Sequence, residues 1–272
     1  MLKCYNAMNF SKSQINGSQN LLKIFCGLIV TVLTCIAIGH YAFKNGTLTC
    51  EHYVLNTYLY IVLAILIMFI MVLANDQFGI LNGILNVLYS SVHPFIGFVI
   101  FLIIIIGLTW ALHSVNPANI LASNLIWLAL IIFTGILMVP IIIYGRMMHV
   151  VGLAGLLTVA LVLITGLLGY YLGDKIVTFD WDYYLNIGVW VMIFAYFGVF
   201  LVHDIRKYMF VLAIISLVMF VLLLLSNHKK LKDDADKCID GKVIPNYPVE
   251  SYGLVIKMVN IMSDLIFILK RR

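Results

Sequence analysis

Long uninterrupted apolar runs constrain this chain more than any other feature of its sequence. Eight runs approach the roughly 20 residues that a helix needs to cross a bilayer. They cover residues 22–43, 53–74, 94–113, 119–144, 149–172, 183–203, 208–226 and 249–269. Backbone polar groups must be paired within lipid, and runs of this length favour helices over barrel strands. The sequence therefore predicts an all-α fold, a polytopic transmembrane helical bundle of seven or eight helices.

Composition supports this prediction and limits the domain organisation. The chain is 63% hydrophobic and only 11% charged, with a mean hydropathy of +1.07, whereas soluble domains average about 25% charged residues. We expect a polar N-terminal tail over residues 1–21 and a single transmembrane helical domain over residues 22–272. The first run is too long for a cleaved signal peptide. The one substantial polar loop is expected at residues 227–248.

Several classes of function are disfavoured by the pattern of charges and motifs. The net charge of +5 comes from clusters of mixed sign, so no basic face for nucleic acid is expected. The cysteines have neither metal-binding spacing nor a paired pattern, and they indicate little about the redox compartment; they are Cys4, Cys26, Cys35, Cys50 and Cys238. No phosphate-binding glycine loop, catalytic triad or redox motif is found. We expect no enzymatic activity, no cofactor and no metal site, with the lipid bilayer as the main partner.

Basic residues in short flanks predict the orientation of a membrane protein, because they stay in the cytosol. The N-terminal tail, Arg146 between the fourth and fifth runs, and Arg206 with Lys207 after the sixth agree on one side. This arrangement predicts a cytosolic N-terminus. It places Asn45, in the sequon Asn45-Gly46-Thr47, in the lumen as a glycosylation candidate. For Arg146, the simplest interpretation is a loop charge that fixes orientation.

A few polar residues lie within or beside apolar runs, where charge is costly and marks candidate functional sites. Asp204 ends the sixth run next to His203, which could tune a nearby proton equilibrium. Lys257 lies inside the last run, and Asn260 and Asp264 follow on the same helical face. This polar stripe is expected to face protein or water. The alternatives are a partly interfacial amphipathic helix for the stripe and a plain interfacial carboxylate for Asp204.

Small residues in the fifth run predict close helix packing rather than a binding site. Gly166, Gly169 and Gly173 recur at intervals of three and four residues, which places them on one helical face. Such stripes let the backbones of neighbouring membrane helices approach each other.

Four short motifs together resemble the Bax inhibitor-1 family, also called the transmembrane Bax inhibitor motif family. They are Ile106-Gly107-Leu108-Thr109, Gly145-Arg146-Met147-Met148, Leu201-Val202-His203-Asp204 and Leu254-Val255-Ile256-Lys257-Met258-Val259-Asn260-Ile261-Met262. The resemblance implies calcium leak from internal stores, suppression of cell death, and an endoplasmic reticulum or Golgi location. It also implies calcium ions and membrane cell-death regulators as partners. Two aspartates on the last two helices would share a proton and gate a pore.

The sequence departs from this pattern at the second aspartate position, which is Lys257. Two adjacent carboxylates titrate readily, whereas an aspartate facing a lysine keeps both groups charged. We therefore expect Asp204 and Lys257 to form a pH-insensitive latch, with Asp264 as a possible displaced second acid. The latch requires the 208–226 run to be re-entrant or peripheral, which would leave residues 227–248 in the cytosol.

The acid-to-base change also supports a different class of function. A non-conducting membrane scaffold or interaction protein could keep the fold after losing the acidic gate. A secondary transporter is less well supported, because the sequence has no internal repeat with paired broken helices.

Overall fold

The computed structural model describes residues 17–44, 46–81, 83, 94–177, 181–200 and 205–270. Within these ranges eight long helices follow one another, and a short β-hairpin joins the first two. The elements are α2 (Gly17–Tyr41), β1 (Phe43–Lys44), β2 (Thr47–Leu48), α3 (Tyr53–Phe78), α5 (Pro94–Ser114), α6 (Ile120–Met147), α7 (Val151–Ile176), α8 (Trp181–Phe200), α9 (Ile205–Ile239) and α10 (Tyr247–Leu269). The all-α helical bundle is confirmed, and each apolar run corresponds to one helix.

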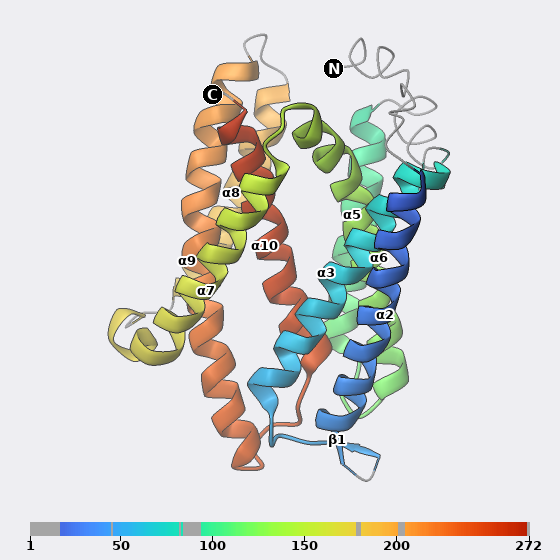
Figure 1. The fold of residues 1–272 in the computed structure, drawn as a ribbon. Helices are drawn as coiled ribbons and strands as arrows, with labels where there is room; N and C mark the ends of the chain where they lie inside the picture. The colour runs from blue at the N-terminus through green and yellow to red at the C-terminus, as the bar shows by residue number, and fades with distance from the viewer. Residues whose placement is uncertain are drawn as a thin grey trace.

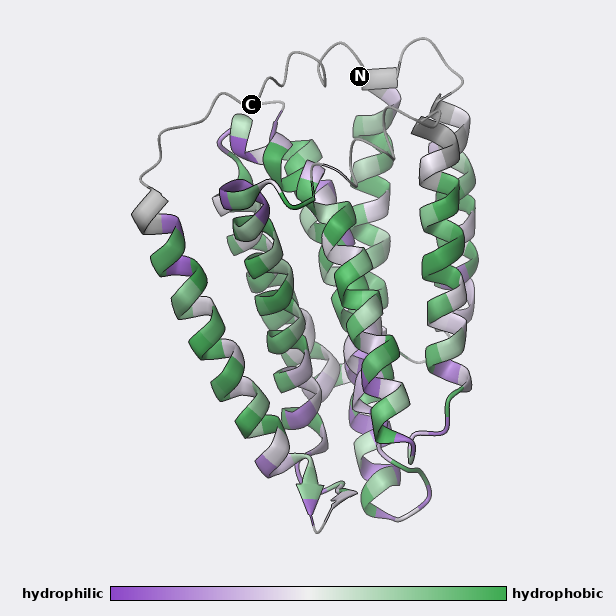
Figure 2. Ribbon diagram, turned by 90° about the vertical axis from the view of Figure 1, so that its right-hand side faces the viewer, coloured by the Kyte–Doolittle hydropathy of each residue, from purple (hydrophilic) through white to green (hydrophobic). Residues whose placement is uncertain are grey.

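The helices have the length and hydropathy of membrane spans. In the described part of the chain, six are long and apolar enough to cross a bilayer, and α5 and α8 carry shorter apolar stretches at Val99–Ser114 and Tyr183–Tyr196. Figure 2 shows hydrophobic residues along the helices and hydrophilic residues gathered towards their ends. Because there is too little polar surface for a soluble bundle, the chain is an integral, multi-pass membrane protein.

The helix α10 occupies the centre of the bundle (Figure 1). It packs against α3, α5, α6, α7 and α9, whereas α2 packs mainly on α3, and α8 mainly on α9. Several of its side chains, including Val255, Ile261 and Ile266, are fully buried. The start of α2 and the end of α10 lie at the upper end of the bundle in Figure 1, and the β1–β2 hairpin lies at the lower end.

The helix α9 corrects two expectations. It is continuous over 35 residues, about 52 Å at 1.5 Å per residue, which exceeds the roughly 30 Å hydrocarbon core. The 208–226 segment is therefore neither re-entrant nor peripheral. The expected 227–248 loop is mostly helix, and only residues 240–246 connect α9 to α10. The helix continues into this polar segment because lysine has a high helix propensity. An ion pair also stabilises it, since Lys237 pairs with Asp234 one turn away at 3.0 Å.

Side-chain caps set where α6 and α10 begin. Asn119 Oδ1 accepts a hydrogen bond from the Ala122 backbone N–H at 3.3 Å, and Asn246 Oδ1 accepts one from Val249 at 3.4 Å. Asparagine caps supply a partner for N–H groups that the first helical turn leaves unpaired. Pro248, in the first turn of α10, lacks an N–H and suits that position. These caps fix the starts of α6 and α10.

Gly169 and Gly173 of α7 lie directly against α9, which confirms the expected packing role for these two, whereas Gly166 faces Tyr58 of α3 and His228 of α9. A Cβ atom on Gly169 would lie 2.6 Å from His228 Cβ and 2.9 Å from the Leu225 carbonyl oxygen, and one on Gly173 would lie 3.0 Å from Lys229 Cβ. Glycine thus lets the two backbones meet.

We expect Gly169→Ala to destabilise the bundle by about 1–3 kcal/mol, because the added methyl group would overlap backbone that cannot move aside alone. Gly155→Ala on the same helix is the matched control, since its Cβ would have no atom within 4 Å. That change should be neutral or slightly stabilising, because alanine favours helix over glycine. Thermal unfolding of both variants in detergent checks this, and equal melting temperatures would contradict it.

Candidate functional site

A buried carboxylate lies where α8, α9 and α10 meet. Asp264 on α10 is only 5% exposed. The Tyr196 hydroxyl on α8 donates to its Oδ1 at 3.5 Å, and Ser216 on α9 lies beside both groups. The apolar faces of three helices thus converge around one acidic side chain. This cluster is the centre of the candidate site.

One oxygen of this carboxylate has no hydrogen-bond partner in the part of the chain that the structure describes. Asp264 Oδ2 is buried and unpaired among the described residues, and a charge in this position is costly unless something compensates for it. No three His, Cys, Asp or Glu side chains come together as a metal site in the part of the chain that the structure describes. With its open oxygen, the Asp264 carboxylate offers a single anionic ligand in this cluster.

The other members of the predicted stripe use the backbone of their own helix. Lys257 Nζ donates to the Gly253 carbonyl at 3.0 Å, and Asn260 Nδ2 donates to the Ile256 carbonyl at 2.7 Å. Lys257 also lies close enough to His228 and Glu250 to interact with them electrostatically. The side chains of Lys257 and Asn260 are half-buried. Of the three, only Asp264 is fully buried.

Asp204 and His203 lie outside the described residues, so the proposed latch remains a prediction. The geometry of the neighbouring helices counts against it. The start of α9 precedes Ser216 by 11 residues, about 16 Å along the axis, and Lys257 lies about 10 Å beyond the level of Asp264. Because α9 and α10 run in opposite directions, about 26 Å separate Lys257 from the residues that follow Asp204.

The basic turn after α6 makes a contact that the sequence did not reveal. Arg146 forms an ion pair with Asp76 near the end of α3. It therefore links the end of α6 to the end of α3, in addition to adding a positive charge there. Arg206 and Lys207 lie in the first turn of α9 at the same end of the bundle. Their side chains are outside the described residues.

A disulfide at the lower end of the bundle was missed by the sequence analysis. Cys50, just before α3, is bonded to Cys238 at the end of α9, across a sequence separation of 188 residues. The sequence does contain a signal for this pairing. Cys26 and Cys35 lie in apolar runs, whereas Cys50 and Cys238 lie in polar segments at helix ends. Cys50 and Cys238 are therefore paired, contrary to the expectation that the cysteines have no paired pattern and indicate little about the redox compartment.

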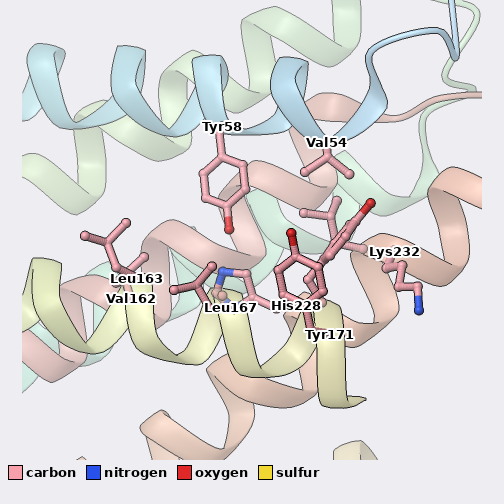
Figure 3. Close-up of a pocket in the computed structure, with 11 residues that line it drawn as sticks. Val54, Tyr58, Val162, Leu163, Leu167, Tyr171, His228 and Lys232 are labelled. Carbon is pink, nitrogen blue, oxygen red and sulfur yellow. The ribbon is translucent and has the colours of Figure 1, made fainter. Parts of the chain in front are cut away.

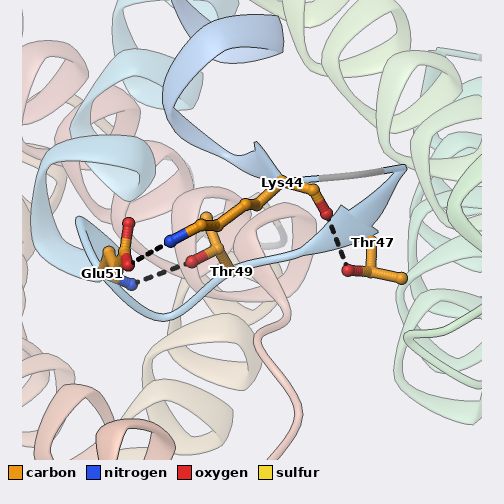
Figure 4. Close-up of polar contacts among 4 residues, drawn as sticks. All are labelled: Lys44, Thr47, Thr49 and Glu51. Carbon is orange, nitrogen blue, oxygen red and sulfur yellow. Dashed lines mark hydrogen bonds and ion pairs between the residues drawn. The ribbon is translucent and has the colours of Figure 1, made fainter.

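Polar contacts order the hairpin beside this disulfide (Figure 4). Lys44 Nζ pairs with Glu51 Oε1 at 2.7 Å, and Thr47 Oγ1 donates to the Lys44 carbonyl at 2.9 Å. The hydrogen bond from Lys44, together with its charge, lowers the pKa of the exposed Glu51 carboxyl. The Tyr247 hydroxyl, at the start of α10, donates to the Thr49 carbonyl. The loop is thus tied to the central helix.

The disulfide also bears on orientation. Disulfides persist in oxidising compartments such as the endoplasmic reticulum lumen. The disulfide thus favours an oxidising compartment at the lower end, which is the side opposite the cytosolic N-terminus expected from the basic flanks, and this orientation stays a prediction. Asn45 itself lies outside the described residues, but its neighbours Lys44 and Gly46 belong to this hairpin. The end of α9 lies at the same end of the bundle as this hairpin, so a lumenal Asn45 and a cytosolic 227–248 segment cannot both be right.

A comparison with protein families adds independent information. Residues 50–272 match the family model described as "Inhibitor of apoptosis-promoting Bax1". The match begins at Cys50 and includes every helix from α3 to α10. No curated protein and no solved structure matches the chain.

Proposed function

Because the chain belongs to the Bax inhibitor family, we propose that it is a non-enzymatic leak pathway for cations, calcium among them, in an endoplasmic reticulum or Golgi membrane. Through this leak it would lower the calcium content of the organelle and restrain cell death. Membrane cell-death regulators are its proposed protein partners. Family membership rests on the match over residues 50–272.

The observation that carries this proposal is the buried Asp264 carboxylate, with its unpaired Oδ2 oxygen. An ionisable group deep in a membrane bundle is costly, and such groups mark ion pathways. Asp264 lies on the central helix and faces two others, so a cation that passes between α8, α9 and α10 would meet it. Tyr196 and Ser216 would supply hydroxyl groups to a partly dehydrated ion.

Calcium flux from vesicles that contain the purified full-length protein tests the proposal. We expect the wild type to release trapped calcium at least about tenfold faster than protein-free vesicles, because a channel lowers the barrier that bare lipid presents to ions. A wild type that releases no more calcium than protein-free vesicles would contradict the proposal.

A second candidate, the non-conducting scaffold, is favoured by Lys257, whose positive charge lies near the middle of the central helix. Lys257→Asp distinguishes the two functions, and Lys257→Met controls for loss of the lysine. A silent wild type and a conducting Lys257→Asp variant would identify a scaffold that has lost its acidic gate. Conduction by the wild type would rule out the scaffold as a non-conductor.

A further inference from the structure

A pocket separate from the Asp264 cluster opens between α3, α7 and α9 (Figure 3). Its volume is about 400 Å³. The walls are mostly aliphatic and aromatic; the lining includes Tyr58 from α3, Val162 and Leu167 from α7, and His228 and Lys232 from α9. At its rim Leu163, Leu167 and Tyr171 are largely exposed on the outside of the bundle. The pocket therefore opens sideways, towards the lipid.

One polar atom in this pocket has no partner. His228 is 3% exposed, and its Nε2 makes no hydrogen bond with any described residue. Its other ring nitrogen, Nδ1, lies 2.7 Å from the Leu224 carbonyl oxygen. A carbonyl oxygen only accepts, so Nδ1 carries the proton and Nε2 of the neutral ring is an acceptor. The pocket thus offers a buried acceptor that requires a donor.

The Tyr58 hydroxyl lies beside this acceptor but does not satisfy it. The two rings stack at a centroid distance of 6.1 Å, and Figure 3 shows the hydroxyl pointing towards His228. Glycine at position 166 keeps the space between them open, since a Cβ there would lie 3.2 Å from the Tyr58 oxygen and 3.5 Å from His228 Nε2. A hydroxyl group in this space could accept from Tyr58 and donate to His228.

The charges around the pocket indicate its depth in the membrane. Lys232, one turn further along α9, pairs with Asp174 at 3.3 Å, and Lys229 donates to the Val177 carbonyl at 2.9 Å. These groups mark the membrane surface at the lower ends of α7 and α9. Val162 lies further into the bilayer along α7, about 12 Å from Tyr170. An occupant whose hydroxyl reaches His228, one turn (about 6 Å) inside Lys232, would have its polar tip just below the surface and its apolar body in the hydrocarbon.

We propose that this pocket binds a neutral membrane lipid that carries a free hydroxyl group, which donates to His228 Nε2 and accepts from Tyr58. An anionic headgroup fits poorly, because Nε2 is itself an acceptor and Lys232 already pairs with Asp174. A single water molecule would satisfy His228 but leave the apolar volume unfilled. Sterols and diacylglycerols share the required chemistry, an uncharged hydroxyl above an apolar body.

Photoaffinity labelling of the full-length protein in phosphatidylcholine vesicles tests this proposal. The probes are a photoreactive 3β-hydroxysterol, its 3-ketone analogue, which cannot donate, and a photoreactive diacylglycerol. We expect saturable labelling of peptides from α7 or α9 by the sterol, the diacylglycerol or both, and the effective probe identifies the lipid class. The ketone should label about tenfold less than the hydroxysterol if the sterol is bound, as expected when a buried acceptor loses its donor.

Two variants locate the binding atoms. His228→Phe removes the acceptor, and Tyr58→Phe removes the hydroxyl but keeps the ring, so each should reduce labelling about fivefold to tenfold. His113→Phe is the matched control, because exposed His113 makes the same contact through Nδ1, with the Thr109 carbonyl at 2.8 Å. It should label as the wild type does. Melting temperatures confirm folding, and the more conservative Tyr58→Phe keeps the test valid if His228→Phe unfolds.

Three results would overturn the proposal. The first is no saturable labelling by either hydroxyl lipid. The second is labelling by the hydroxysterol and the ketone in equal amounts. The third is labelling that stays at wild-type levels in folded Tyr58→Phe and His228→Phe protein, which would assign the His228 nitrogen to water instead.

Discussion

Replacing Asp264 with asparagine is expected to lower calcium flux through the reconstituted protein at least about tenfold. Asparagine has nearly the same shape and can still pair with Tyr196, but it carries no charge. A carboxylate about 4 Å from a cation contributes on the order of 4 kcal/mol for each unit of cation charge at an effective dielectric constant of about 20. Removing that charge where Asp264 is buried should therefore raise the barrier to a passing cation. Release of vesicle-trapped calcium measures the effect.

The matched control for this variant is Asp174→Asn. Asp174 is also an aspartate paired with polar neighbours, but its side chain is 67% exposed near the lower end of α7. Its replacement should leave the flux within about twofold of the wild type, because exposed charges are screened by water and salt. If wild-type protein conducts and Asp264→Asn conducts equally well, the buried carboxylate is not on the ion pathway.

Breaking the disulfide is the second change for which we expect a large effect. Cys50→Ser or Cys238→Ser should lower the free energy of unfolding by about 2–4 kcal/mol, the usual range for a disulfide that closes a long loop. The bond spans 188 residues and holds the first loop against the end of α9. Thermal unfolding in detergent, without reductant, measures the loss.

A double variant sharpens this test. Cys50→Ser combined with Cys238→Ser should cost no more than either change alone, because the same bond is lost in each case. Cys26→Ser is the control, since Cys26 is a free, exposed cysteine on α2. Additive effects, or reaction of Cys50 and Cys238 in unreduced protein with a thiol reagent, would contradict the bond.

The fold could be predicted from the sequence because lipid allows few alternatives. Each apolar run had to become a helix, and eight did within the described residues. The error at α9 has a physical origin. Hydropathy locates the hydrocarbon boundary, but helical hydrogen bonding continues beyond it when residues such as Lys229 and Lys232 find partners in Asp174 and in the Val177 carbonyl. The membrane-spanning segment and the helix can therefore end at different residues.

The candidate site was only partly predictable. Helical periodicity correctly placed Lys257, Asn260 and Asp264 on one stripe, because that depends on a single helix. Tyr196 and Ser216 could not be identified in this way, since their contact with Asp264 depends on how three helices pack. The pairing of Asp204 with Lys257 was assumed from the resemblance, and the continuity of α9 now argues against it.

The central position of α10 has a consequence for how the protein is made. This helix follows the other seven that the structure describes, so the ribosome completes it after them, yet it packs against five of those seven. Until it inserts, the helices made earlier lack the contacts that it supplies to them. Cys50 likewise cannot form its bond to Cys238 until that residue has been synthesised. The disulfide can therefore be completed only near the end of α9, and the core of the bundle only after α10 has been made.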